Sequence, residues 1–168
     1  EHENLQPRIR GTLLMALANR NKALVLATGN KAEMAVGYCT MYGDMVGALA
    51  VLGDLLKLEV YEIGRALDTL WGSQMIPERV YTKEPTAELR PDQKDSDSLP
   101  DYNKLDTFIR NYLREKLSPE DAAPDGFDGK RWAKVLEAMD FKRQQAPPVL
   151  RVSDFAFQRE RQSMVAKG

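Results

Sequence analysis

The sequence has 168 residues, of which 43% are hydrophobic and 29% are charged, with a formal net charge of −1 at pH 7. This length supports one domain with a sizeable core, and the near-neutral charge gives no long-range field to attract nucleic acid or an acidic membrane surface. Cys39 is the only cysteine and His2 the only histidine, which excludes an internal disulfide and argues against a Ser-His-Asp triad, a Cys-His pair or an ordinary zinc site.

The chain also lacks the patterns that direct proteins to membranes. No run approaches the roughly 18 apolar residues that a membrane span needs, and no signal-peptide pattern opens the sequence. We therefore expect a cytoplasmic protein that binds neither nucleic acid nor a membrane. The chain starts at Glu1 without a methionine and enters a helical pattern at once, so we expect a piece of a longer protein.

The first predicted element is an amphipathic helix over residues 4–20. Asn4 is expected to cap it, which would place Pro7 in the first turn, where a missing N–H costs nothing. One apolar residue recurs every four positions and predicts a buried stripe: Leu5, Ile9, Leu13 and Leu17.

A buried strand and a second helix are predicted next. The apolar run 23–27 indicates the strand, and the Thr28 hydroxyl at its end either binds a nucleotide, as ligands of open α/β sheets bind at strand ends, or satisfies its own turn. Asn30 and Glu33 match the capping box of the helix that follows. Cys39 is expected on the buried face of that helix, as a small hydrophobe.

A further strand and helix repeat this order. The run 48–52 predicts a strand beside the first, and Gly53-Asp54 is expected to open a helix that ends near Leu70. If Asp54 is the cap, Lys57 falls in the first turn, the unfavourable end of the helix dipole for a cation. Lys57 is therefore either a solvated surface residue or, together with free N–H groups, part of a phosphate-binding helix end.

The second half of the chain is expected to be mainly helical. Residues 92–101 are rich in Asp, Ser, Lys and Pro and predict a mobile loop. Helices are predicted over residues 102–116, over a short stretch opened by Ser118-Pro119, and over residues 129–142. We expect one domain over residues 1–150 and an irregular tail over residues 151–168.

Six segments carry a family resemblance: Thr28-Gly29-Asn30-Lys31-x-Glu33-Met34-Ala35-Val36-Gly37-Tyr38-x-Thr40-x-Tyr42-Gly43-Asp44, Gly53-Asp54-x-x-Lys57, Pro77-Glu78-Arg79-Val80, Glu84-Pro85-Thr86-Ala87-Glu88-Leu89-Arg90-Pro91-Asp92-Gln93, Asp97-Ser98-Leu99-Pro100-x-Tyr102 and Lys142-Arg143-x-Gln145-Ala146-Pro147-Pro148. Together they are similar to the glutamine-dependent NAD synthetases, in family order over nearly the whole chain. The resemblance implies a partial Rossmann-like parallel sheet of the adenine nucleotide alpha-hydrolase type with helices, followed by a mainly helical C-terminal section.

The resemblance also implies a reaction. The complete enzyme would use ATP and Mg²⁺ to adenylate the nicotinate carboxylate of deamido-NAD, and ammonia from glutamine would then displace AMP. The resemblance implies that ATP is bound by Thr28, Lys57 and Thr86. It implies that deamido-NAD is bound by a second set: Asn4, Arg8, Glu33 and Lys142.

Several of these residues have a structural alternative. Asn4 is also a helix cap, and Glu33, which the resemblance makes a candidate magnesium ligand, also completes a capping box. Lys142 also suits the dipole at the end of its helix. Met41 stands where the ammonia-dependent relatives carry a lysine, and Gln144 stands where an arginine is usual in the family.

The family's pyrophosphate loop and amidase domain have no counterpart in this sequence, so the resemblance implies upstream portions of the same protein as partners, and we also expect a homo-oligomer. Without those portions we expect the chain to be inactive alone. Two alternatives stay open, namely a fragment of another ATP-pyrophosphatase amide-forming enzyme and a non-catalytic interaction module.

Overall fold

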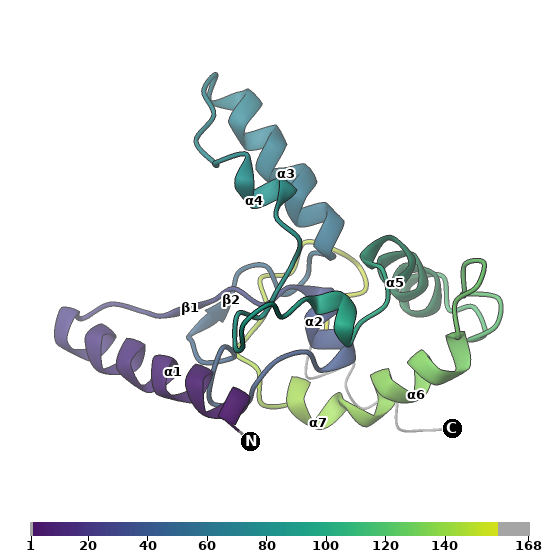
Figure 1. Ribbon diagram of the computed structural model, residues 1–168, viewed down its shortest axis with the longest axis horizontal. Coiled ribbons are helices and arrows are strands. Elements are labelled where there is room, and N and C mark those ends of the chain that lie inside the picture. Colours follow the sequence, from purple (N-terminus) through teal and green to yellow (C-terminus); the bar gives the residue numbers. More distant parts are fainter. Residues whose placement is uncertain (1, 158–168) are drawn as a thin grey trace.

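The computed structural model describes residues 2–157, with the side chain of residue 2 left out (Figure 1). The elements in chain order are α1 (His2–Asn21), β1 (Leu26–Ala27), α2 (Lys31–Val36), β2 (Leu49–Ala50), α3 (Lys57–Leu70), α4 (Arg79–Thr82), the 3-10 turn η1 (Asp95–Asp97), α5 (Tyr102–Ile109), the π-helical turn η2 (Arg110–Arg114), α6 (Gly129–Ala138) and α7 (Asp140–Arg143). This confirms the expected α/β class with a mainly helical second half. The expected tail continues into residues 158–168, which lie outside the described part.

The sheet is small and parallel. Leu26 pairs with Leu49 and Ala27 with Ala50, as expected for two neighbouring strands, although both strands are shorter than the apolar runs that predicted them. The chain returns after α7 and adds a parallel bridge between Ala50 and Val149. The chain just before the predicted tail of residues 151–168 therefore forms a third partner of the sheet.

The core lies where α2 packs against α5, α6 and the chain after α7. Phe108, Leu105 and Ile109 of α5 are fully buried, and Trp132 and Leu136 of α6 pack into the same cluster. These are the inward positions that the helical spacing of the second half predicts. Figure 1 shows α2 at the centre, with α5 and α6 on one side of it and α1 on the other.

Two helices do not bury the face that their sequence predicts. Helix α1 packs through Pro7, Gly11 and Ala18, whereas its leucine stripe faces solvent, with Leu13 59% exposed. The far half of α3 projects from the body together with α4 (Figure 1), leaving Leu70 77% exposed. Within the described residues the leucine stripe of α1 and the end of α3 therefore stay exposed to solvent.

Several helix boundaries differ from the prediction for local reasons. Helix α1 begins at His2, so Asn4 lies inside it and is not its cap. Helix α2 ends at Gly37, which adopts a left-handed conformation with φ of 70°, so Cys39 lies beyond the helix. The stretch after Ser118 forms only a turn, in which the Ser118 hydroxyl accepts a hydrogen bond from the Asp121 N–H.

The first residues of α3 are also capped differently from the prediction. The helix begins at Lys57, and Asp54 contacts Lys31 instead of the helix. No helix in the part of the chain that the structure describes is long and apolar enough to cross a bilayer.

Candidate functional site

A cavity of about 450 Å³ lies between α1, the segment after α2, the start of α3 and the loop before α5. Five of the seven residues that the resemblance assigns to ATP or deamido-NAD line it: Asn4, Glu33, Lys57, Thr86 and Lys142. These five come from five separate parts of the chain, and only the tertiary structure brings them together.

Glu33 and Lys57 form the charged pair of this cavity. The capping box of α2 is confirmed, because the Glu33 N–H donates to Asn30 Oδ1 and the Asn30 N–H donates to Glu33 Oε2, at 3.0 and 3.1 Å. The other oxygen, Glu33 Oε1, lies 3.4 Å from Lys57 Nζ. One carboxylate therefore serves both the helix and the cavity, with a different oxygen for each.

Burial and charge act in opposite directions on this carboxyl. Burial raises the pKa of Glu33, while the nearby Lys57 ammonium and the Asn30 N–H oppose the rise. The two side chains remain about one-fifth exposed, 21% for Glu33 and 18% for Lys57. A ligand entering the cavity can therefore reach both charges.

Lys57 lies in the first turn of α3, as predicted, although the helix begins at Lys57 itself and not after an Asp54 cap. This helix end is not a free set of N–H groups. The Leu56 N–H donates to Glu59 Oε2 and the Leu58 N–H donates to Asp106 Oδ2, both at 2.8 Å. The idea that open amides help to bind a phosphate here is therefore wrong for these two groups. The positive charge at this point comes from the Lys57 ammonium, which lies 5.4 Å from the centre of the Tyr102 ring.

The loop that carries Thr86 is tied to the cavity wall at Asp95. The Asp95 N–H donates to the Pro85 carbonyl at 2.9 Å, and the Tyr102 hydroxyl donates to Asp95 Oδ2 at 2.8 Å. Asp95 is only 5% exposed and Leu99 only 8%, so this loop buries more side-chain surface than its polar composition predicts. Its mobility without a ligand stays a prediction.

Asn4 and Arg8 lie one turn apart on α1, but they point to different partners. Asn4 Oδ1 accepts a hydrogen bond from the Thr40 hydroxyl at 3.1 Å on the cavity wall. Arg8 Nε donates to the Met41 carbonyl at 3.2 Å, and Arg8 does not line the cavity. Within the described residues Asn4 thus keeps its amide NH₂ group available, whereas one donor of Arg8 is engaged by the backbone.

Lys142 reaches the cavity from the end of α7. Its ammonium donates to the carbonyls of Gly37 and Cys39 at 2.6 and 2.8 Å, which satisfies backbone groups just beyond the end of α2. An ammonium has three donors, so one remains for a ligand. Burial raises the pKa of the neighbouring Cys39 thiol to about 11, which agrees with the expectation that Cys39 is not a nucleophile.

Thr28 lies outside this cavity. It follows β1 directly and its side chain is exposed, but it does not line the space that Lys57 faces. Thr28 and Lys57, both of which the resemblance assigns to ATP, therefore do not line one shared cavity within the described residues. The ATP contact of Thr28 stays a prediction that this geometry does not support.

Sequence reasoning missed several residues of the cavity wall, chiefly Tyr38 and Asp95. Two buried atoms on them, Tyr38 Oη and Asp95 Oδ1, have no hydrogen-bond partner within the described residues. Burial and the nearby Asp95 carboxylate raise the pKa of Tyr38 to about 12. Tyr38 stands in the first resemblance segment, which was the available signal, whereas Asp95 had no signal beyond its loop.

A magnesium ion would find few protein ligands in this cavity. Within residues 2–157, no three or more His, Cys, Asp or Glu side chains gather where they could hold a metal ion. Magnesium is often held by one or two carboxylates together with substrate phosphates, and Glu33 Oε1 faces the cavity for such a contact. The metal role of Glu33 therefore stays a prediction that the donor set permits.

Comparisons with known proteins agree on one family. The family described as NAD synthase matches residues 1–146. The glutamine-dependent NAD(+) synthetase of Acinetobacter baylyi is 51% identical over 99% of this chain, and that of Thermotoga maritima is 50% identical over 92%. The chain spans only 31% and 27% of the lengths of these two relatives.

Solved structures agree with the fold. A crystal structure of a glutamine-dependent NAD(+) synthetase from Cytophaga hutchinsonii matches 98% of this chain and 30% of its own, with a TM-score of 0.65 and 21% sequence identity. At this level of identity the match supports the architecture of the chain and not the roles of single residues.

Proposed function

Since the chain belongs to the NAD synthase family, we propose that it is the C-terminal part of a synthetase that makes NAD from deamido-NAD, ATP and ammonia. The ammonia would come from glutamine, which the names of its relatives include. The chain spans less than a third of these relatives, so the pyrophosphate loop and the amidase belong to upstream portions in this proposal.

The observation that carries the proposal is the cavity in which Glu33 and Lys57 face each other beside Thr86 and Lys142. Amide formation by adenylation needs no histidine base. The carboxylate oxygen of deamido-NAD bonds to the α-phosphorus of ATP as pyrophosphate leaves, and ammonia then attacks the activated carbon as AMP leaves with the bonding electrons and a proton is released. Such a site mainly positions the reactants and neutralises phosphate charge.

Each cavity residue has a role that follows from its position. The Lys57 ammonium neutralises phosphate charge, and the Thr86 hydroxyl, which now accepts from the Glu88 N–H at 3.1 Å, donates to the nucleotide. Asn4 and Lys142 offer N–H donors to deamido-NAD. Glu33 Oε1 orients deamido-NAD or holds a magnesium ion, whose chemistry when bound is to neutralise the transferring phosphoryl group.

Calorimetric titration of the full-length protein with ATP and with deamido-NAD tests this assignment. Lys57→Ala removes the cation that faces the cavity, so we expect ATP affinity to fall about 10- to 100-fold, as for the loss of a charge-assisted hydrogen bond. Glu33→Gln keeps the size of the side chain and is expected to weaken deamido-NAD binding.

Lys130→Ala is the matched control, because Lys130 pairs with Glu120 on the surface and does not line the cavity. Equal ATP affinity of the wild-type protein and the Lys57→Ala variant would contradict the role of Lys57. Failure of both nucleotides to bind the wild-type protein would contradict the proposed function. The isolated chain is expected to form no NAD, and ATP-dependent formation by it would show that the upstream portions are not needed.

A non-catalytic interaction module is the second candidate, and the exposed stripe of α1 favours it. Leu5, Leu13 and Leu17 are 52%, 59% and 51% exposed. A row of exposed leucines on one face of a helix is unusual and is typical of an interaction surface. Light scattering separates the two candidates. An oligomer that binds neither nucleotide would favour the module, whereas nucleotide binding that Lys57→Ala weakens favours the ligase.

A further inference from the structure

A second charged pair, which the resemblance does not assign, joins the start of α2 to the chain that leads into α3, and neither of its residues lines the cavity. Lys31 Nζ is 2.6 Å from Asp54 Oδ1, and both side chains are fully buried. The Lys31 ammonium also donates to the Ser153 hydroxyl at 3.0 Å and lies 3.3 Å from the centre of the Phe155 ring. The Lys31 side chain is thus enclosed on every side.

The chain after α7 closes this pair. Asp54 Oδ2 accepts hydrogen bonds from the N–H groups of Val152 and Ser153, at 2.7 and 2.5 Å, and Asp54 Oδ1 accepts one from the Ser153 hydroxyl at 2.9 Å. Just before these residues, the Leu150 N–H donates to the Ala50 carbonyl at 3.1 Å. Residues 148–155 therefore run along β2 and end on Asp54.

The same pair joins the two cavity charges through short stretches of backbone. Lys31 precedes Glu33 by two residues and Asp54 precedes Lys57 by three. Besides the ion pair, the Lys31 N–H donates to the Leu55 carbonyl at 2.7 Å. The start of α2 and the chain that leads into α3 are thus held together by residues that do not line the cavity.

We propose that Ser153 is a positioning residue: through the buried Lys31–Asp54 pair, the segment 148–155 acts as a clasp that sets the spacing of Glu33 and Lys57. The consequence for catalysis rests on the proposed function, because it takes Lys57 as the residue that receives the phosphates of ATP. Ser153 itself does not line the cavity, so its effect on a ligand must pass through Asp54 and Lys31.

The test compares Ser153→Ala and Ser153→Thr with the wild-type full-length protein. Alanine removes the hydroxyl that contacts both Lys31 and Asp54, whereas threonine keeps it. Hydrogen exchange read by mass spectrometry follows peptides that cover residues 148–155 and 53–60, and steady-state kinetics gives KM for ATP and kcat separately. Lys130→Ala is the surface control.

We expect Ser153→Ala to speed exchange in both peptides and to raise KM for ATP about 3- to 10-fold, with kcat within about twofold, because the Lys57 contact is loosened and not removed. Threonine should restore both values, and the control should change neither. Faster exchange confined to residues 148–155, with KM unchanged, would overturn the proposal. If the wild-type protein forms no NAD, the proposed function fails, and the exchange of residues 53–60 still decides whether the clasp exists.

Discussion

Two lysine–carboxylate pairs lie at the starts of α2 and α3 and differ in what surrounds them. Lys31 and Asp54 are 2.6 Å apart with both side chains fully buried, while Lys57 and Glu33 are 3.4 Å apart and about one-fifth exposed. The backbone and the Ser153 hydroxyl fill the remaining hydrogen-bonding capacity of Asp54. The second pair faces an open cavity. A lysine–carboxylate ion pair therefore holds two segments together in one place and forms part of a candidate site in the other.

The surroundings also decide how each pair responds to loss of a partner. Removing one member of a fully buried pair leaves an uncompensated charge away from water, whereas water in an open cavity can solvate part of the charge that remains there. Burial lowers the pKa of Lys31, against the pull of Asp54. Burial works to raise the pKa of Asp54, but hydrogen bonds from Lys31 and from the backbone outweigh it and lower that pKa.

Lys31→Met is expected to have the largest effect on stability. It leaves Asp54 buried and charged without its cation, so the free energy of unfolding should fall by about 3–5 kcal/mol. The matched variant Lys57→Met removes the same charge from a pair that is about one-fifth exposed at a cavity, so the fall should be smaller, about 1–2 kcal/mol. Urea unfolding of both variants followed by circular dichroism measures the difference, and equal losses would show that burial does not distinguish the two pairs.

Asp106 sharpens the comparison because it is a buried carboxyl without a cation in contact. It accepts a hydrogen bond from the Leu58 N–H at 2.8 Å, and burial raises its pKa to about 6. The folded protein therefore keeps this proton at pH values where the unfolded chain has lost it. The stabilisation is fully present below about pH 4 and is lost as the pH rises through about 6, by up to about 3 kcal/mol.

Asp106→Asn removes this titration and keeps an oxygen that can accept from Leu58. Urea unfolding at pH 4, 5, 6 and 7 should therefore give a wild-type minus variant difference that decreases as the pH rises, while the other carboxyls cancel. A difference that stays constant from pH 4 to pH 7 would mean that Asp106 is ionised in the folded protein throughout this range.

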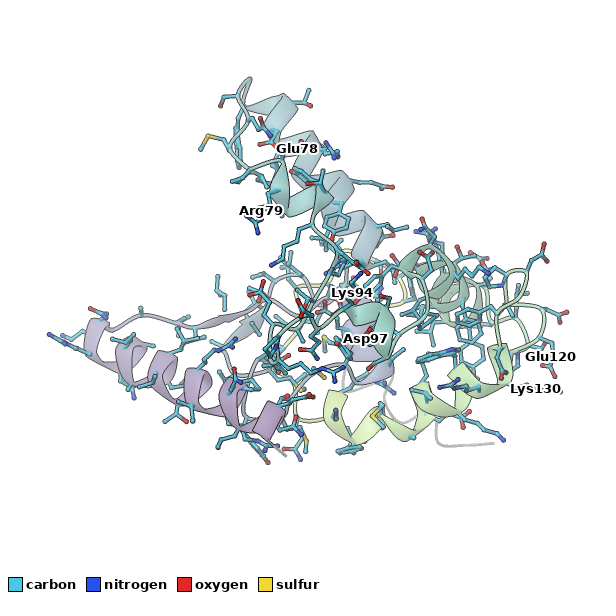
Figure 2. All side chains as sticks on the ribbon, in the orientation of Figure 1. Glu78, Arg79, Lys94, Asp97, Glu120 and Lys130 are labelled. Carbon is cyan, nitrogen blue, oxygen red and sulfur yellow. The ribbon has the colours of Figure 1, made fainter. Side chains whose placement is uncertain are left out.

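The exposed pair of Lys130 and Glu120 sets the lower limit of the comparison. Figure 2 shows these two residues next to each other near the start of α6, and Lys130 Nζ is 2.7 Å from Glu120 Oε1. Both side chains are more than half exposed, so salt and water screen the attraction. Lys130→Ala should leave the urea midpoint unchanged within error at both low and high salt, and a clear shift would mean that the pair is part of a larger charge network.

Local rules predicted the features that depend on neighbours in the chain. The capping box of Asn30 and Glu33 forms as its spacing predicts, and Lys57 stands in the first turn of α3. The inward faces of α5 and α6 also follow from their helical spacing. The role of Asp54 was predicted wrongly. An aspartate can either cap a helix or pair with a buried lysine, and only the position of Lys31 in space shows that Asp54 does the second.

The leucine stripe of α1 marks a limit of the same reasoning. Periodicity predicts that one face of a helix is apolar, and Leu13 and Leu17 are both on that face. It does not say which partner covers the face, and within the described residues α1 packs through Pro7 and Gly11 instead. Gly11 fits because a Cβ there would lie 2.9 Å from the Gly43 carbonyl oxygen. A close backbone approach of this kind leaves no periodic signal.

The sequence by itself determined the family, the order of the two strands and the longer helices, and which residues are candidates for nucleotide binding, since each of these rests on residue types at fixed spacing. Only the tertiary structure decided that Lys57 and Glu33 share a cavity with Thr86 while Thr28 does not, and that Lys31 is buried against Asp54 and Ser153. The physical reason is that desolvation and hydrogen bonding between distant segments depend on distances in space, which spacing along the chain does not contain.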